Sequence, residues 1–156
     1  MNTRDTAPTA EGIARYRYLL PMLESAIHEM RDFAKKKPDG IVSSTKIKIL
    51  NRLLIDLKEI IKAEESASYL EPLSEEELPQ NSDAVLILGQ YLSALESFER
   101  RNTKEINYRK TWITQEWLDQ KEKEEEEEFS EGEEDEEEEE DEDENEDQDE
   151  EDEDKR

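Results

Sequence analysis

The chain has 156 residues, of which 47 are acidic and 21 are basic, so its formal net charge at pH 7 is −26. Residues 122–156 hold 27 of the acidic residues and only 3 of the basic ones. Residues 1–121 carry a net charge of −2 and contain 49 of the 50 apolar residues. This separation predicts a small folded body followed by an acidic tail, which cannot bury enough apolar surface to offset the entropy of ordering it.

The composition also excludes or disfavours several classes of protein. The chain has no cysteine, which excludes disulfides and thiolate metal sites. The longest apolar run, Ala84–Leu88, has only five residues, too few to span a membrane. Residues 1–8 lack the apolar segment of a secretory signal and predict a frayed end. We therefore expect a protein outside the membrane, in the cytoplasm or, in a eukaryotic cell, in the nucleus.

A first helix is predicted from Thr9, a suitable N-cap, to the basic run Lys35–Lys37, where Pro38–Gly40 ends it. Pro21 removes a backbone hydrogen bond inside this segment, so the helix is either kinked or divided there. The apolar phase continues across the proline and favours a kink. Steps of three and four residues give one apolar stripe: Ile13, Tyr16, Leu20, Leu23, Ile27, Met30 and Ala34.

A second helix is predicted after Ser43 or Ser44, either of which can serve as its N-cap, and it ends near Glu64–Ser66. Its apolar face is wider than a coiled-coil seam, which indicates that the helix packs on more than one neighbour. The main stripe contains Ile47, Leu50, Leu54, Leu57 and Ile61, and three further residues widen it: Ile49, Leu53 and Ile60.

Residues 67–82 are predicted to connect this helix to a third one, with one short helical turn at Ser74–Glu77. Asn81 or Ser82 is the expected N-cap of the third helix. Gly89 lies inside this helix, which suggests a close crossing with another helix. The apolar stripe consists of Val85, Leu88, Leu92 and Leu95, extended by Tyr91 and Phe98.

The pattern weakens after Asn102, where apolar residues are irregularly spaced. A fourth helix is predicted to begin near Thr111 or Thr114 and to end at Ser130–Gly132. The predicted fold class is therefore all-α: a small three- or four-helix bundle within residues 9–121, followed by a disordered acidic C-terminal tail at residues 122–156.

Catalytic and metal sites are not favoured by the sequence. His28, the single histidine, lies between Glu24 and Asp32 on one polar helix face, as surface histidines commonly do. The segment 141–147 begins like a calcium-binding loop, but Glu146 stands where the turn needs glycine. The four glycines are isolated and form no phosphate-binding loop. We expect no enzymatic activity, no catalytic residues, no metal and no cofactor.

The leading hypothesis is a non-enzymatic helical interaction protein with a basic partner. The dense carboxylates of the tail make it a polyanion that can hold or shield a basic protein surface, as a chaperone of a nucleic-acid-binding protein does. The body then docks on the partner or forms homo-oligomers. The expected partner-binding residues are Glu133, Glu134, Asp135, Glu136, Asp141, Asp143 and the isolated aromatic residue Phe129.

The alternative hypothesis is a nucleic-acid-binding module whose acidic tail competes with the nucleic acid. Residues 31–62 carry a net charge of +5 and residues 100–121 carry +3, although a nearly neutral body is a poor match for DNA. Tyr108 and Trp112 could stack on bases. The candidate phosphate contacts are Lys35, Lys36, Lys37, Arg100, Arg101, Arg109 and Lys110. A third alternative is an enzyme or the regulatory subunit of one.

Overall fold

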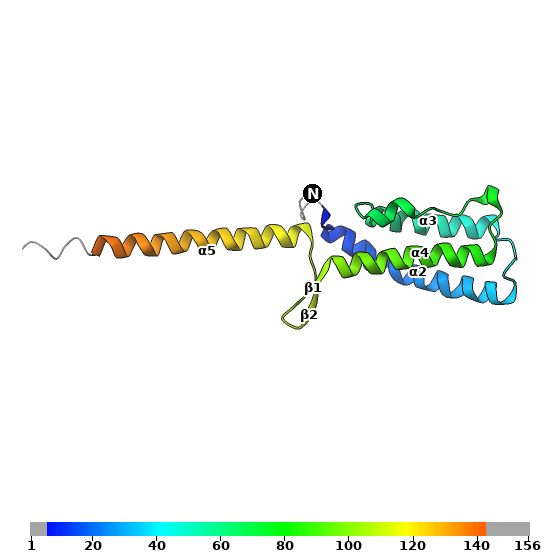
Figure 1. The fold of residues 1–156 in the computed structure, drawn as a ribbon, viewed down its shortest axis with the longest axis horizontal. Coiled ribbons are helices and arrows are strands. Elements are labelled where there is room, and N and C mark those ends of the chain that lie inside the picture. Colours follow the sequence, from blue (N-terminus) through cyan, green and yellow to red (C-terminus); the bar gives the residue numbers. More distant parts are fainter. Residues whose placement is uncertain (1–5, 143–156) are drawn as a thin grey trace, which may run out of the picture. The chain divides into compact units, whose positions relative to one another are not determined.

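The structure is a computed structural model that describes residues 6–142, with side chains as far as residue 130. The chain forms two compact units, Met1–Glu116 and Trp117–Arg156. In the first unit, α2 (Ala10–Lys36), α3 (Ser44–Ile60) and α4 (Asn81–Arg101) pack together (Figure 1). The expected all-α class with a three-helix bundle is thus confirmed.

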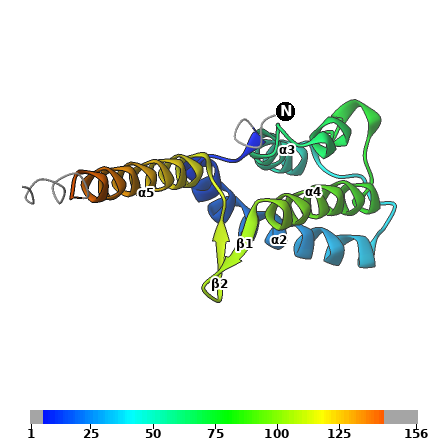
Figure 2. The same ribbon diagram turned by 60° about the vertical axis from the view of Figure 1, so that its left-hand side comes forward.

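The remaining elements are short, apart from the last helix. The 3₁₀ turns η1 (Glu65–Tyr69) and η2 (Glu75–Glu77) lie between α3 and α4, and η2 confirms the predicted turn before Pro79. A hairpin of β1 (Thr103–Ile106) and β2 (Arg109–Trp112) follows α4 (Figure 2). Helix α5 (Gln115–Glu142) begins at the end of the first unit. Within residues 6–142, none of the helices combines the length and the apolar character of a membrane span.

The helix starts follow local capping chemistry. Thr9 and Ser43 are confirmed as N-caps, because their side-chain oxygens accept hydrogen bonds from backbone N–H groups three residues on, at 3.0 and 3.3 Å. The prediction for α4 was wrong: its N-cap is Gln80, whose backbone N–H donates to Asp83 at 2.8 Å. Asn81 is buried instead, and its Nδ2 donates to the Lys37 carbonyl at 2.9 Å. This bond ties the start of α4 to the end of α2.

Helix α2 is one continuous helix through Pro21, so it is not divided there. Its N-terminus receives a carboxylate from far along the chain: Glu116 accepts the backbone N–H of Ala10 at 2.9 and 3.1 Å. Hydrogen bonds from its own backbone N–H and from that of Ala10 hold the pKa of Glu116 below its usual value. Gln115 also binds the carbonyls of Ala7 and Pro8. Of the end predicted to fray, residues 1–5 lie outside the described residues, and Ala7 is buried.

The buried core follows most of the predicted stripes. The entire main stripe of α3 is buried. Leu19 is buried in place of Leu20, which is only partly buried. Either residue continues the three-and-four spacing between Tyr16 and Leu23, so the spacing alone does not distinguish them. Ile49 is 65% exposed and does not widen the core. Three connector residues complete the core, which the sequence did not reveal: Ala67, Leu70 and Leu73.

Two polar side chains of α3 hold the connector in place. Asn51 makes two hydrogen bonds with the backbone of Leu73, at 2.8 and 2.9 Å. Lys58 donates its Nζ to the carbonyl of Leu70 at 2.6 Å. These bonds satisfy backbone groups that lack partners in regular secondary structure. The acidic residues of the connector are therefore displayed from a fixed backbone.

The β-hairpin corrects the sequence analysis, which read residues 103–112 as irregular and allowed a helix from Thr111. Asn107 and Tyr108 form its two-residue turn with φ values of 51° and 59°, as a type I′ turn requires. Trp112 anchors the hairpin on the bundle, with ring centroids 5.1 Å from Tyr16 and 5.8 Å from Phe98. The helix that follows starts at Gln115, directly after the alternative start Thr114.

Helix α5 passes through the predicted end at Ser130–Gly132 and continues to Glu142. The high helix propensity of glutamate outweighs the single glycine in this segment. The hydroxyl of Ser130 donates to the carbonyl of Glu127 at 3.0 Å and follows the helix rather than capping it. Of the tail predicted to be disordered, residues 122–142 lie in α5, and residues 143–156 lie outside the described residues.

Candidate interaction surfaces

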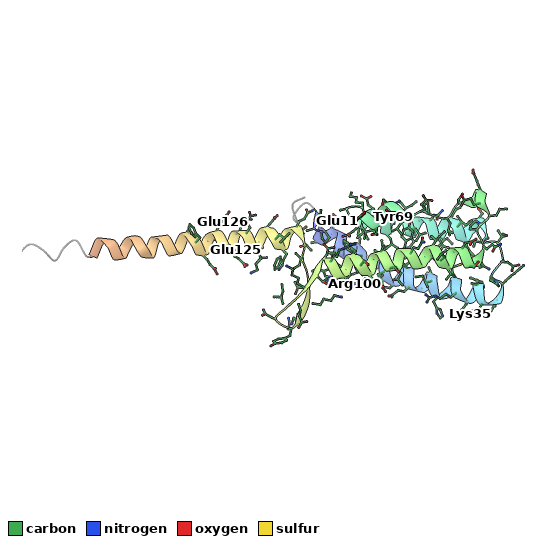
Figure 3. All side chains as sticks on the ribbon, viewed as in Figure 1. Glu11, Lys35, Tyr69, Arg100, Glu125 and Glu126 are labelled. Carbon is green, nitrogen blue, oxygen red and sulfur yellow. The ribbon has the colours of Figure 1, made fainter. Side chains whose placement is uncertain are left out.

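The two clusters of candidate phosphate contacts, Lys35–Lys37 and Arg100–Lys110, lie at opposite ends of the bundle. Helix α4 starts beside the end of α2, where Asn81 binds Lys37. It ends beside the start of α2, where the rings of Tyr16 and Phe98 are 5.9 Å apart. The 21 residues of α4 span about 30 Å at ~1.5 Å per residue. Lys35–Lys37 and Arg100–Lys110 therefore do not form one surface (Figure 3).

The basic residues at the hairpin end of the bundle are partly neutralised by carboxylates of the body. Arg101 forms an ion pair with Glu64, and Lys110 forms one with Glu99 at 2.7 Å. At the other end, Lys35 Nζ lies 3.9 Å from Asp32. Of the two aromatic residues expected to stack on bases, Tyr108 is 97% exposed at the hairpin tip. Trp112 packs in the aromatic cluster and is not free for stacking.

Tyr16 links the aromatic cluster to this polar network. Its hydroxyl donates to Glu99 Oε2 at 3.3 Å, while Lys110 holds the other oxygen of the same carboxylate. Burial raises the pKa of Tyr16 well above its usual value, and the negative charge of Glu99 raises it further. This arrangement fastens the hairpin to α2 and α4 and is structural in character.

His28 lies on the surface of α2. Its side chain is 81% exposed, and Nε2 is 3.7 Å from Asp32 Oδ2, one helical turn away. This position agrees with the interpretation as a surface histidine. Among the residues that the structure describes, no group of three or more histidine, cysteine, aspartate and glutamate side chains is placed to hold a metal ion.

The second unit carries the carboxylates expected to bind a basic partner. Lys121 binds Glu124 on α5, which raises the pKa of the lysine and lowers that of the glutamate. Glu125–Glu128 are exposed, and Phe129 beside them is 71% exposed. The other expected contacts fall beyond the described side chains: Glu133, Glu134, Asp135, Glu136 and Asp141 lie in the described backbone of α5, and Asp143 lies outside it.

A groove between α2 and α3 is a further surface that the sequence did not reveal. Its volume is about 340 Å³, and its floor includes the buried Met30 and Leu50. Met22 and Ile49 stand exposed on its rim, and Lys46 Nζ lies 3.6 Å from the centre of the Phe33 ring. Ile49, which was expected to widen the apolar stripe of α3, instead lies exposed at the rim of this groove.

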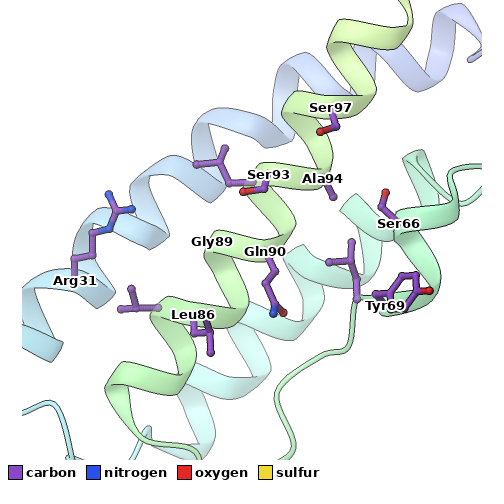
Figure 4. Close-up of a pocket in the computed structure, with 12 residues that line it drawn as sticks. Arg31, Ser66, Tyr69, Leu86, Gly89, Gln90, Ser93, Ala94 and Ser97 are labelled. Atoms are coloured by element: carbon purple, nitrogen blue, oxygen red, sulfur yellow. The ribbon is translucent and has the colours of Figure 1, made fainter.

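The outer face of α4 holds a second hollow, of about 800 Å³, lined by small residues of α4 (Figure 4). Gly89, Ser93 and Ser97 follow each other there at intervals of four residues. Apart from its own helix, no heavy atom lies within 4 Å of the position that a Cβ on Gly89 would take. The prediction of a close helix crossing at Gly89 is therefore wrong within the described part of the chain. No other described helix packs against α4 at Gly89, and this face of α4 is open.

Comparisons of the chain with protein-family models, with curated proteins and with solved structures find no match.

Proposed function

We propose that the protein is a non-enzymatic helical interaction protein whose acidic C-terminal segment binds or shields the basic surface of a partner protein. The observation that carries this proposal is the row of exposed carboxylates Glu125–Glu128 at the start of a tail with a net charge of −24. Like charges at this density attract a basic surface over roughly a Debye length of ~8–10 Å at physiological salt.

The distribution of ion pairs within the chain supports the same proposal. In the body, carboxylates such as Glu64 and Glu99 are neutralised by Arg101 and Lys110. On α5 the described glutamates outnumber the lysines, so most of their charge is available to an external cation. Phe129 adds an exposed apolar side chain among these charges, which suits an anchor for the partner.

The test is the binding of a labelled lysine- and arginine-rich protein by the full chain and by a chain ending at Lys121. Binding should be lost on truncation and should weaken steeply between about 50 and 200 mM salt, because exposed charges are screened. Replacement of Phe129 by Ala, which leaves the charge unchanged, should weaken the complex less than truncation does. Undiminished binding by the truncated chain would refute the proposal.

A nucleic-acid-binding module regulated by the tail is the second candidate. It is favoured by the exposed Tyr108 at the hairpin tip beside Arg109 and Lys110. The distance between the two basic ends and the pairing of Arg101 and Lys110 weigh against it. The first candidate is therefore preferred.

A further inference from the structure

The hollow on the outer face of α4 continues into a second one. This neighbour, of about 460 Å³, shares Tyr69, Leu86 and Gln90 with the first. We call the two together the α4 valley. Tyr69 is 78% exposed and Leu86 is 64% exposed, so two large apolar side chains border an open trough of small residues. Side chains of this size exposed beside a concavity are typical of a docking surface.

The charged residues that line the second hollow of the α4 valley are all acidic. Residues 63–99 contain nine acidic residues and no basic one. Glu71, Glu77 and Asp83 line the second hollow. Within the described part of the chain, neither Glu71 nor Glu77 takes part in an ion pair. The single basic lining residue of the two hollows, among those described, is Arg31 on α2.

A polar atom beside the first hollow also lacks a partner. Ser66 Oγ is buried and makes no hydrogen bond with any described residue. Ser66 lies on the side of the hollow formed by η1, next to Tyr69 (Figure 4). Buried hydroxyls are normally hydrogen-bonded, so Ser66 leaves one unsatisfied polar group beside the hollow.

We propose that the α4 valley is a docking site for a basic amphipathic helix of a partner protein. The small residues at i, i+4 and i+8 allow another helix to approach the backbone of α4 closely. Tyr69 and Leu86 would pack against the apolar face of that helix, and Glu71 and Glu77 would face its lysines or arginines. This inference goes beyond the proposed function, because it assigns a contact to the body that does not depend on the tail.

The test uses the full chain and two fluorescent peptides of about 18 leucine and lysine residues with identical composition. In the first peptide the leucines form one face of a helix, and in the second they are spread around it. Fluorescence anisotropy at about 150 mM salt measures the affinity of each. Both peptides have the same charge, so attraction to the tail is equal and a preference for the first reports an apolar contact.

Variants of the valley then locate that contact. Leu86→Ser and Tyr69→Ala should each weaken binding of the amphipathic peptide about tenfold, as loss of an anchor side chain does. Gly89→Leu should weaken it as well by filling the valley, although the change raises helix propensity. The matched controls are Ile55→Ser and Tyr18→Ala, which alter side chains that are 61% and 73% exposed elsewhere on the bundle. Both controls should bind like the unaltered chain.

The possible failures of the two proposals differ. Equal affinity for the two peptides, or unchanged binding by Leu86→Ser and Gly89→Leu, would overturn the valley proposal and leave the tail's function intact. A chain with Glu124–Glu128 changed to Gln separates them further. If it still prefers the amphipathic peptide and still responds to Leu86→Ser, the valley acts independently of these five glutamates. If that preference disappears with the glutamates, the valley proposal is wrong.

Discussion

Adjacent residues of α3 have opposite environments, which makes the core directly testable. Leu54 and Leu57 are 0% exposed, whereas Ile55 between them is 61% exposed. Leu54→Ala or Leu57→Ala should lower the free energy of unfolding by about 2–5 kcal/mol, because each leaves a cavity among packed side chains. Ile55→Ala should change it by only about 0.5 kcal/mol.

Chemical denaturation measures these differences. The double variant with both leucines changed should be largely unfolded, since a domain of this size has about 5–10 kcal/mol of stability in total. A double variant that melts at the same temperature as the unaltered protein would contradict the assignment of this face to the core.

The hydroxyl of Tyr16 makes stability sensitive to alkaline pH. Burial and the neighbouring Glu99 raise its pKa in the folded protein above the usual value of 10.0. A group whose pKa is raised on folding stabilises fully below its unfolded pKa, and this contribution is lost as the pH rises toward the folded pKa. Stability should therefore fall above about pH 10.

Tyr16→Phe keeps the ring packing and removes the ionisable group. The loss of stability between about pH 9 and pH 11, measured by denaturation at each pH, should be smaller in this variant. This pH range brackets the usual tyrosine pKa of about 10. Burial raises the pKa of Tyr91 too, so part of the loss should persist. Tyr18→Phe, at an exposed position, serves as the control and should leave the pH dependence unchanged.

At the residue scale, the sequence revealed the apolar stripes but not the buried polar contacts. The periodicity of Ile47, Leu50, Leu54 and Leu57 suffices to identify the core of α3, because each lies on one face of the same helix. Asn51 and Asn81 could not be interpreted in this way. Their partners are backbone carbonyls 22 and 44 residues away, and only the tertiary fold brings these groups together.

At the element scale, the hairpin is the main feature that sequence reasoning missed. Its signal consists of short β-branched and aromatic stretches around Asn107, which favours the left-handed turn conformation. Strands of four residues are too short for alternation to stand out against the irregular spacing of Ile106, Tyr108 and Trp112. The aromatic contact of Trp112 with Tyr16 and Phe98, which holds the hairpin in place, is long-range and leaves no local pattern.

Helix α5 should be much less stable beyond Lys121 than the helices of the bundle. Consecutive glutamates such as Glu124–Glu128 repel one another at i, i+4, although each has a good intrinsic helix propensity. We expect rapid amide exchange over residues 130–156 at neutral pH and moderate salt, while the amides of α3 and α4 remain protected.

Acidification provides a second measurement of the same property. Neutralised glutamates no longer repel one another. Far-ultraviolet circular dichroism should therefore show more helix near pH 4, which is about the pKa of glutamate, than at pH 7. Amides over Glu133–Glu142 that remain protected at neutral pH would contradict the expected low stability of this part of α5.

At the scale of the whole molecule, charged residues of like sign are grouped into separate segments of the chain. Residues 31–62 carry +5, residues 63–99 carry −9 and the tail from residue 122 carries −24. The acidic middle segment borders the α4 valley, so the body and the tail share a preference for a basic partner. The candidate phosphate contacts Lys35–Lys37 and Arg100–Lys110 lie at the two ends of the bundle, which limits their joint effect on a polyanion.

Truncation after Lys121 separates the two candidate functions. If the tail competes for the body's own basic groups, its removal should tighten binding of DNA or RNA, and the gain should shrink as salt rises. The residues exposed would be Lys35–Lys37, Arg100, Arg101, Arg109 and Lys110. If the tail serves an external basic partner, removal should abolish binding of that partner and leave nucleic-acid affinity negligible. We expect the second outcome, because Arg101 and Lys110 are already paired with Glu64 and Glu99. Tight binding of duplex DNA by the truncated chain in about 150 mM salt would reverse this ranking and identify the protein as a nucleic-acid-binding module.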